Sequence, residues 1–414
     1  MHWWLENVRI WYSNELVDGA IEIDTETGLI SRISREATNH GVDGKGLWVL
    51  PGMIDLHVHL RDFEESYKED FHSGSLAALH GGVTTVFDMP NKKPPVVTQE
   101  DLARVQEKIK KEGLIDIFSY LLFTKRDIPW GDHKLLKGIF GGTHGAGNSL
   151  MRDLHWVTEH FSGILALHLE DSDCFNENAK LHHEKRPPKA EYEAVRRFLS
   201  NLPKIKQAHV HIAHLSTNVA LAAVIRARKA GITCEATPHH VFLDTEIISS
   251  LGKRSIVNPP LRAPSDRRAI HQGIMNGSID FIATDHAPHT IEEKEDLGLA
   301  GMPGLETALP LLLTDMAQGN LTLERIAQLY AEGPANLMGL SDRGKISQNR
   351  IADLVLVDPY KKWKLRADDL YSKCKWSPFE DNSFVGAVAA TLKKGTAVFM
   401  DSNILPGSFL DQAH

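Results

Sequence analysis

Short apolar segments recur through the middle of this chain, and each is followed by a polar cluster and then by a stretch with helical periodicity. The pattern predicts strands that alternate with helices, for example helices over residues 98–113 and 189–202. We count eight apolar segments, at residues 53–60, 83–89, 115–123, 135–141, 164–170, 208–215, 232–238 and 279–285. Eight such units predict an α/β fold, a (β/α)8 TIM-like barrel. An open doubly wound sheet is the rival fold, but no Gly-x-Gly-x-x-Gly sequence follows a predicted strand.

The two ends of the chain have a different pattern, in which apolar and polar residues alternate as they do in half-buried strands. The sequence Thr-Glu-Thr-Gly at residues 25–28 separates two alternating stretches, as a hairpin turn would. We therefore expect residues 1–50 and 345–405 to form one small β-sandwich domain. Residues 51–344 would then form the catalytic barrel domain.

Composition excludes several classes of protein. The chain has 414 residues, 42% apolar and 24% charged, which is typical of a globular protein. The net charge of −8 and the lack of a long Lys/Arg block argue against nucleic-acid binding. Three widely spaced cysteines and the lack of a long uncharged apolar run predict a cytoplasmic protein without a membrane span. The 22 histidines stand out, because imidazole is a common metal ligand.

Residues that can bind a metal end four of the predicted strands. His57 and His59 end the first strand, and residues two apart on a strand point to the same side. His168, His214 and Asp285 end the fifth, sixth and eighth strands. Active sites of TIM barrels lie at these carboxyl-terminal strand ends, so we expect the five side chains to meet there.

Imidazole and carboxylate ligands without a thiolate fit Zn²⁺ or another divalent transition metal held for catalysis. Such a metal lowers the pKa of its bound water to about 7. Asp285 could accept that proton and pass it to a leaving nitrogen. A His-x-His pair alone is weak evidence, but five such residues at predicted strand ends favour a metal site over a structural role.

Further polar residues at the same predicted rim indicate an anionic, amide-like substrate. Arg61, two residues beyond His59, has a planar guanidinium that suits a carboxylate. Asn91, Asn258 and His289 add donors and acceptors. Each of them alone is more often a turn or capping residue, and only their common position favours substrate binding.

Two other histidines on the sixth strand are expected to have no such role. His209 and His211 alternate out of phase with His214, whereas Val210 and Ile212 alternate in phase with it. We therefore expect His209 and His211 to face the helix layer.

Motifs around the candidate residues are spread over nearly the whole chain. In order they are PGMIDLHVHLRD, DMPNKKPPVVT, HLED, HIAHLST, EATPHHVFL, NPPLR, ATDHAPHT and GMPGLETALP. They resemble the signatures of the dihydroorotases of the amidohydrolase superfamily. Arg61 directly after HVHL and Asn91 after DMP match that family's contacts with the dihydroorotate carboxylate, where allantoinases and hydantoinases usually differ.

The resemblance implies a reaction and roles for the candidate residues. The reaction is the reversible cyclisation of N-carbamoyl-L-aspartate to dihydroorotate in pyrimidine biosynthesis, with one or two Zn²⁺ ions per subunit. The implied metal ligands are His57, His59, His168, His214 and Asp285, with Asp285 also the proton shuttle. The implied substrate-binding residues are Arg61, Asn91, Asn258 and His289, and the loop around Gly301 to Gly304 is expected to close near the ring.

The fourth strand departs from the family pattern. Family members have there either a lysine whose carbamate bridges two metals or an Asp-Asp-Gly turn. Here the segment is LLKGIFGGTHGAGNS, in which Lys137 lies two or three residues too early and His144 takes roughly the place of the Asp-Asp turn. The metal hypotheses are, in order, a single-metal centre, a two-metal centre bridged by His144 or a shifted Lys137, and a metal-poor site.

Other functions stay open at this point. The chain could be another cyclic amidohydrolase, of the allantoinase or hydantoinase kind, or a non-catalytic homologue that assembles with a partner such as a transcarbamoylase. The retained metal-binding and substrate residues favour catalysis, because a scaffold has no physical need for them. The expected partner is a small-molecule substrate, and a homodimer is compatible with the sequence.

Overall fold

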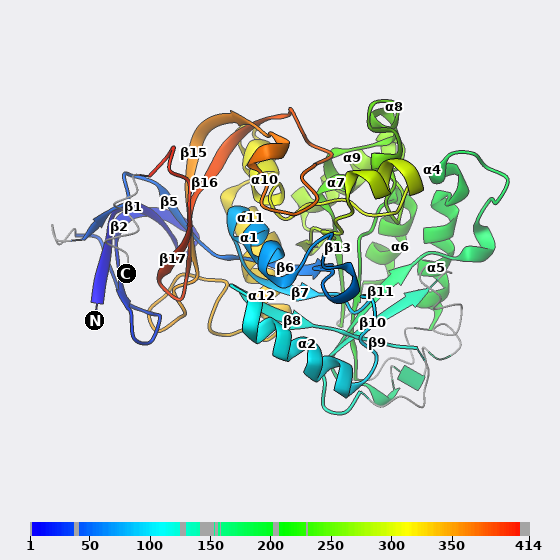
Figure 1. The fold of residues 1–414 in the computed structure, drawn as a ribbon, viewed down its shortest axis with the longest axis horizontal. Helices are drawn as coiled ribbons and strands as arrows, with labels where there is room; N and C mark the ends of the chain where they lie inside the picture. Colours follow the sequence, from blue (N-terminus) through cyan, green and yellow to red (C-terminus); the bar gives the residue numbers. More distant parts are fainter. Residues whose placement is uncertain are drawn as a thin grey trace.

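The middle of the molecule is a barrel of parallel strands surrounded by helices (Figure 1). The computed structural model describes residues 2–36, 41–124, 130–140, 153, 156–157, 159–201, 207–228 and 231–405. The barrel strands are β6 (Met53–Val58), β7 (Val83–Asp88), β8 (Asp116–Ser119), β9 (Leu121–Leu122), β10 (Leu135–Phe140), β11 (Ile164–Leu169), β12 (His209–Ile212), β13 (Ile232–Ala236) and β14 (Phe281–Ile282). Each predicted apolar segment contains one of these strands, or two in the case of residues 115–123.

Two parallel ladders make up the barrel wall. One joins β6, β7 and β8, and the other runs in sequence order from β9 to β14. β8 and β9 are consecutive pieces on either side of Tyr120, so together they form the third barrel strand. The wall closes where the backbone N–H of His59 donates to the carbonyl of His286 at 2.7 Å, beside a parallel bridge between Val58 and His286. The TIM-like barrel expected from the sequence is thereby confirmed.

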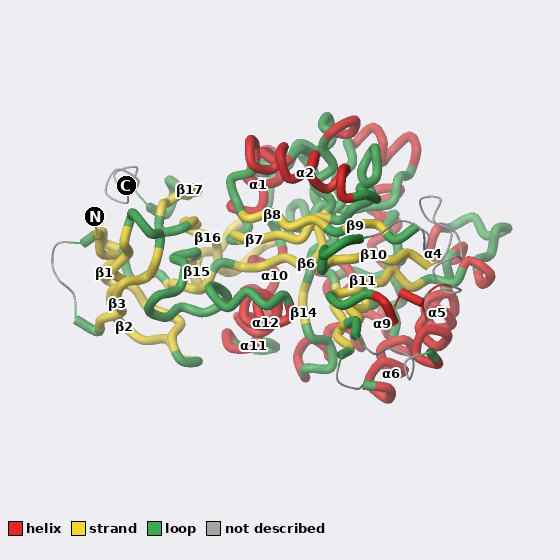
Figure 2. Tube along the Cα trace, turned by 90° about the horizontal axis from the view of Figure 1, so that it is seen from below, coloured by secondary structure: helices red, strands yellow, loops and turns green. Residues whose placement is uncertain are grey.

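Helices cover the outside of the barrel (Figure 2). The α-helices are α1 (Phe71–His80), α2 (Gln99–Glu112), α4 (His182–Lys185), α5 (Pro188–Ser200), α6 (Asn218–Ala227), α7 (Pro238–Phe242), α8 (Ile248–Leu251), α9 (Pro264–Asn276), α10 (Ala308–Ala317), α11 (Leu323–Ala327) and α12 (Gly333–Leu337). The 3₁₀- and π-helical turns are η1 (Phe63–Glu65), η2 (Ser172–Cys174), η4 (Thr245–Ile247), η5 (Gly252–Ser255), η6 (Glu293–Leu297), η7 (Gln328–Glu332) and η8 (Ala367–Asp369). The helices predicted over residues 98–113 and 189–202 correspond to α2 and α5, and Thr98 caps α2 through a reciprocal bond pair with Asp101.

Apolar side chains pack both inside the barrel and between the strands and the helices. The inner cluster includes Ile54, Leu56, Phe87, Met89, Tyr120, Ala166, Phe281 and Ala283. Val210 and Ile212 belong instead to the outer cluster. The imidazole of His211 is buried and lies 5.8 Å from the ring of Phe281, centre to centre. The expectation that His211 faces the helix layer is therefore wrong.

The strands of both chain ends form a separate sheet beside the barrel (Figure 1). Its order is β17-β16-β15-β5-β1-β2-β3, and β4 pairs with β1. The strands are β1 (His2–Tyr12), β2 (Glu15–Asp24), β3 (Leu29–Ser34), β4 (Val42–Asp43), β5 (Trp48–Pro51), β15 (Leu354–Lys364), β16 (Ser383–Lys393) and β17 (Thr396–Met400). β2 and β3 form the predicted hairpin, in which Gly28 has a φ of 70° that favours glycine.

Arg343 joins the barrel to this sheet through ion pairs that are largely buried. Its guanidinium contacts Asp116 of β8 and approaches Asp353, next to β15, at 3.8 Å. Lys393 of β16 contacts the same two carboxylates, at 2.6 and 2.5 Å.

Replacing Arg343 with methionine should lower the free energy of unfolding by about 3 kcal/mol, because two carboxylates would keep only one cation. Denaturant unfolding measures the loss. Arg366→Met removes an exposed ion pair with Asp381 and should cost at most about 1 kcal/mol. Equal stability of the two variants would contradict this role of Arg343.

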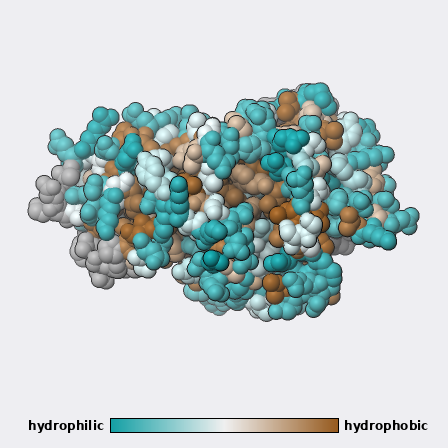
Figure 3. Space-filling view, turned by 90° about the horizontal axis from the view of Figure 1, so that it is seen from above, coloured by the Kyte–Doolittle hydropathy of each residue, from teal (hydrophilic) through white to brown (hydrophobic). Residues whose placement is uncertain are grey.

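Polar residues cover most of the face of the molecule shown in Figure 3, and hydrophobic residues gather toward its middle. Among the described residues, we find no helix with the length and apolar character needed to cross a bilayer.

Candidate active site

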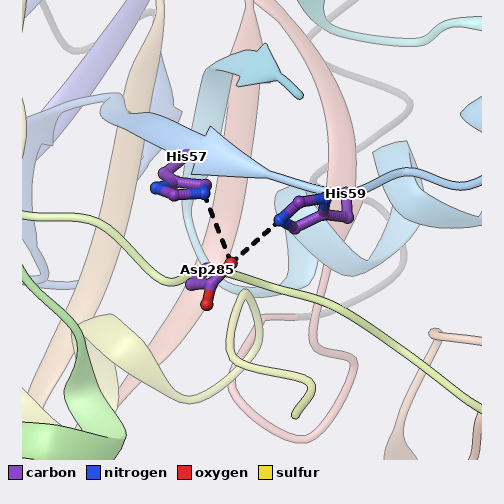
Figure 4. Close-up of side chains that lie close together, drawn as sticks. All are labelled: His57, His59 and Asp285. Atoms are coloured by element: carbon purple, nitrogen blue, oxygen red, sulfur yellow. Dashed lines mark hydrogen bonds and ion pairs between the residues drawn. The ribbon is translucent and has the colours of Figure 1, made fainter. Parts of the chain in front are cut away.

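Three of the predicted metal ligands lie together at the carboxyl-terminal end of the barrel (Figure 4). His57 is on β6, His59 lies just beyond it, and Asp285 follows β14. Nε2 of His57 and Nε2 of His59 lie 3.4 and 3.0 Å from Oδ1 of Asp285. One nitrogen or oxygen from each residue falls within 4.8 Å of the others, close enough to share one ion.

The other two predicted histidine ligands line the same cavity. His168 is on β11 and His214 follows β12, and their rings are 4.7 Å apart, centre to centre. Nδ1 of His168 lies 3.0 Å from Nε2 of His214. The ring of His214 is also 5.3 Å from the ring of His57. The structure thus brings all five predicted residues to one place.

Lys137 of β10 reaches the same cavity. In the strand register it pairs with Ala166 of β11, two residues before His168. Two strand residues span roughly 7 Å, which the long lysine side chain can bridge. Nζ of Lys137 is buried and has no hydrogen-bond partner among the described residues. The side chain of Lys137 therefore reaches the cavity from its shifted position.

His144, the other candidate for a bridging ligand, lies outside the described residues.

The protonation of these groups suits a metal. Burial lowers the pKa of His57 to about 4, and burial also lowers the pKa of His168 and of His214. The imidazoles are therefore neutral near pH 7, which is the form that binds metals. Burial likewise lowers the pKa of Lys137 to about 8. Nδ1 of His214 has no hydrogen-bond partner in the described part of the chain, as expected of a nitrogen available to a ligand. The residues present thus fit a divalent metal.

Arg61 and His289 form a cationic and polar patch beside the predicted ligands. Arg61 is 6% exposed, and its Nη2 lies 3.1 Å from Nε2 of His289. Its Nε donates to the carbonyl of Pro288 at 3.0 Å, which fixes the direction of the guanidinium. Trp376 holds the backbone of His289 by donating a hydrogen bond from Nε1 to its carbonyl at 2.9 Å.

Asn91 and Asn258 line the same cavity, whose volume is about 740 Å³. Oδ1 of Asn258 accepts a hydrogen bond of 2.9 Å from Nε2 of His182. Leu299, Ala300 and Gly301 form part of the cavity rim. The four predicted substrate residues therefore share one cavity with the predicted metal ligands.

The rim loop is held by a buried lysine. Nζ of Lys294 donates to the carbonyls of Ile256, Leu299 and Gly301 at 2.7, 2.7 and 3.0 Å. A side chain at Gly301 would place its Cβ 2.5 Å from the carbonyl oxygen of Ala287, so only glycine fits without a shift of the backbone. The loop is thus fixed close to His289.

Glu235 was not recognised from the sequence. It lies on β13 with no exposed surface, and its Oε1 lies 2.7 Å from Nδ1 of His57. Burial opposes its ionisation, but the imidazoles of His211 and His57 outweigh burial and lower its pKa below the ordinary value. The available signal was a single charged residue inside the apolar segment of residues 232–238.

Comparisons with known proteins agree with this geometry. Residues 48–398 match the model of the amidohydrolase family. A protein named dihydroorotase from Pyrococcus furiosus is 36% identical over 395 residues, 94% of this chain and 91% of that protein. A dihydroorotase from Halobacterium salinarum is 39% identical over 85% of this chain and 86% of its own length.

Solved structures give the same fold. An L-hydantoinase from Arthrobacter aurescens matches with a TM-score of 0.89 at 24% identity over 96% of both chains. A dihydropyrimidinase from Brevibacillus agri matches with a TM-score of 0.86 at 22% identity, over 97% of this chain and 95% of its own. The family match covers most of the sequence and includes the candidate site. The chain therefore belongs to the amidohydrolase family, as its resemblance to dihydroorotases implied, and the prediction of a cyclic amide hydrolase is confirmed.

Proposed function

We propose that this protein is a dihydroorotase that interconverts N-carbamoyl-L-aspartate and dihydroorotate in pyrimidine biosynthesis. One observation supports this substrate above others: Arg61 and His289 lie in the same cavity as the cluster of His57, His59 and Asp285. The cavity thus offers a buried guanidinium next to a metal site. Dihydroorotate has a carboxylate beside its cyclic amide, whereas a simple hydantoin has none.

The substrate would be held at several points. The guanidinium of Arg61 binds the carboxylate by charge-assisted hydrogen bonds, which are about twice as strong as neutral ones. Asn91 and His289 supply further polar contacts at the carboxylate end. Asn258 and the loop at Gly301 lie near the ring. These contacts orient the cyclic amide toward the metal cluster.

Metal dependence follows from membership of the amidohydrolase family. The identity of the metal as Zn²⁺ and the number of ions are part of this proposal. We assign His57, His59, His168, His214 and Asp285 as ligands of Zn²⁺. Of the metal hypotheses, the buried amine of Lys137, which has no hydrogen-bond partner among the described residues, supports the two-metal centre, which a carbamate on Lys137 would help to hold. A bound divalent metal makes a nucleophile available by lowering the pKa of water.

Asp285 moves the proton. Burial raises the pKa of Asp285 above its ordinary value, which favours proton uptake. In the hydrolytic direction its carboxylate accepts a proton from water and then gives it to the ring nitrogen as the amide bond breaks. In the reverse direction the same carboxylate takes a proton from the terminal carbamoyl nitrogen as this nitrogen attacks the side-chain carboxyl group, and gives it to the oxygen that leaves as water.

Turnover by the purified protein tests the proposal. After loading with Zn²⁺, the protein should convert dihydroorotate to N-carbamoyl-aspartate, and a chelator should abolish the conversion. Chromatography of the reaction mixture measures both compounds. A preference for allantoin or hydantoin would contradict the substrate. No turnover of any cyclic amide with any divalent metal would favour the non-catalytic homologue.

Replacing Arg61 with methionine should raise KM for dihydroorotate roughly 30-fold with little change in kcat. Loss of a hydrogen-bonded charge pair costs about 2 kcal/mol, and 1.4 kcal/mol corresponds to a factor of ten. Steady-state kinetics measure the effect. Arg104→Met, which removes an exposed arginine paired with Asp101, is the control and should leave KM unchanged. An unchanged KM for Arg61→Met would contradict carboxylate binding.

A further inference from the structure

Glu235 lies inside the barrel, behind the metal cluster, where it contacts no solvent. We propose that Glu235 is a positioning residue of the metal site, which fixes the tautomer of His57 and anchors the strand end that presents His214. His211, in turn, holds the Glu235 carboxylate in place. This inference rests on the metal site proposed above.

The contact between Glu235 and His57 determines which imidazole nitrogen faces the metal cluster. Oε1 of Glu235 lies 2.7 Å from Nδ1 of His57. A carboxylate at this distance accepts a hydrogen bond from Nδ1, so the proton of the neutral ring resides on Nδ1. The other nitrogen, Nε2, lies 3.4 Å from Oδ1 of Asp285 and keeps its lone pair for an ion. In many metal proteins a carboxylate orients a histidine ligand in this way, by accepting a hydrogen bond from the ring nitrogen that does not bind the metal.

Hydrogen bonds continue from the second carboxylate oxygen to the far end of β12. Oε2 of Glu235 lies 2.7 Å from Nε2 of His211. Nδ1 of His211 lies 3.0 Å from Oγ1 of Thr233, and that hydroxyl lies 3.0 Å from Nε2 of His209. One assignment satisfies every contact with neutral rings: His209 donates to Thr233, Thr233 donates to His211, and His211 donates to Glu235.

Glu235 also holds the end of β12. Its backbone carbonyl accepts a hydrogen bond of 2.9 Å from the N–H of Leu215, and its Oε1 accepts one of 3.4 Å from the N–H of His214. His214 has a φ of 39°, in the left-handed region that non-glycine residues rarely adopt. A single carboxylate thus links the side chain of one predicted ligand to the backbone of another.

Glu235→Gln tests the role, because glutamine keeps the volume and removes the charge. Zn²⁺ affinity, measured by competition with a chromogenic chelator, should fall roughly 10- to 100-fold. The matched control is Glu191→Gln. Glu191 is equally buried, but it bonds the hydroxyls of Ser216 and Thr217 and no predicted ligand. Its replacement should leave Zn²⁺ affinity within twofold of the wild type.

A second measurement, by ¹⁵N NMR, determines directly which nitrogen of His57 carries the proton. In ¹⁵N-histidine-labelled, metal-free protein, His57 should have its proton on Nδ1, and Glu235→Gln should shift part of the population to Nε2. If Glu235→Gln does not fold, His211→Phe keeps a ring of similar shape and removes the donor to Glu235 together with the contact to Thr233. That variant should still weaken Zn²⁺ binding several-fold, whereas a purely structural role predicts lower stability with unchanged affinity.

The outcomes separate the two proposals. A wild-type chain that binds no divalent metal contradicts the metal site. Wild-type affinity and an unchanged His57 tautomer in the Glu235 variant contradict only the positioning role.

Discussion

Replacing Asp285 with asparagine is expected to lower kcat for dihydroorotate by roughly 10²- to 10⁴-fold, the usual contribution of a general acid–base group. Asparagine keeps the shape of the side chain but cannot accept a proton. KM should change little, because Arg61, Asn91 and His289 still bind the substrate. Steady-state kinetics measure the loss, and metal analysis of the same sample separates lost proton transfer from lost metal.

Asp315→Asn is a suitable control for this variant. Asp315 is buried like Asp285, but its carboxylate bonds His271 at 3.0 Å, away from the cavity. Its replacement should lower stability without a comparable loss of kcat. If Asp285→Asn with full metal content retained wild-type kcat, the proposed proton transfer would be wrong.

Replacing Lys137 with alanine is expected to reduce the bound Zn²⁺ from two ions to one and to lower kcat by at least about 100-fold. The pKa of Lys137, lowered by burial to about 8, leaves part of the amine neutral near pH 8. A neutral amine can attack carbon dioxide. A nitrogen–carbon bond would then form, a proton would leave to water, and the resulting carbamate would supply a carboxylate ligand for the metal.

The space left by alanine makes this role testable by rescue. Acetate or propionate should restore part of the activity of Lys137→Ala, because a small carboxylate can occupy the emptied volume. Lys137→Met fills that volume, so it should lose activity without rescue. Full metal content and normal kcat in both variants would exclude a bridging role for Lys137.

The sequence predicted the barrel and the common location of the five candidate ligands for one reason. Barrel strands are buried, so their apolar runs are conspicuous, and a polar residue at the end of such a run marks the active-site edge. The same logic failed within the sixth segment. The left-handed backbone at His214 interrupts the alternation of side chains between the two faces of the strand. Alternation counted backwards from His214 therefore assigned His211 to the wrong face.

Long-range contacts explain why Glu235 was missed. Lys137 was considered from the sequence as a shifted lysine, and its side chain lines the same cavity as the predicted ligands. Glu235 and His57 are far apart in the sequence, and nothing local to either residue indicates that they meet. Contacts of this kind depend on barrel closure, which a single sequence does not display.

The sheet beside the barrel also bears on how the chain is made. β1, β2 and β3 pair with their sequence neighbours and can form as soon as they leave the ribosome. β5 pairs with β1 on one side and with β15 on the other. Its second edge therefore stays unpaired until β15 has been synthesised. An exposed strand edge of this kind can pair with other chains, so the late synthesis of β15 exposes the nascent sheet to aggregation.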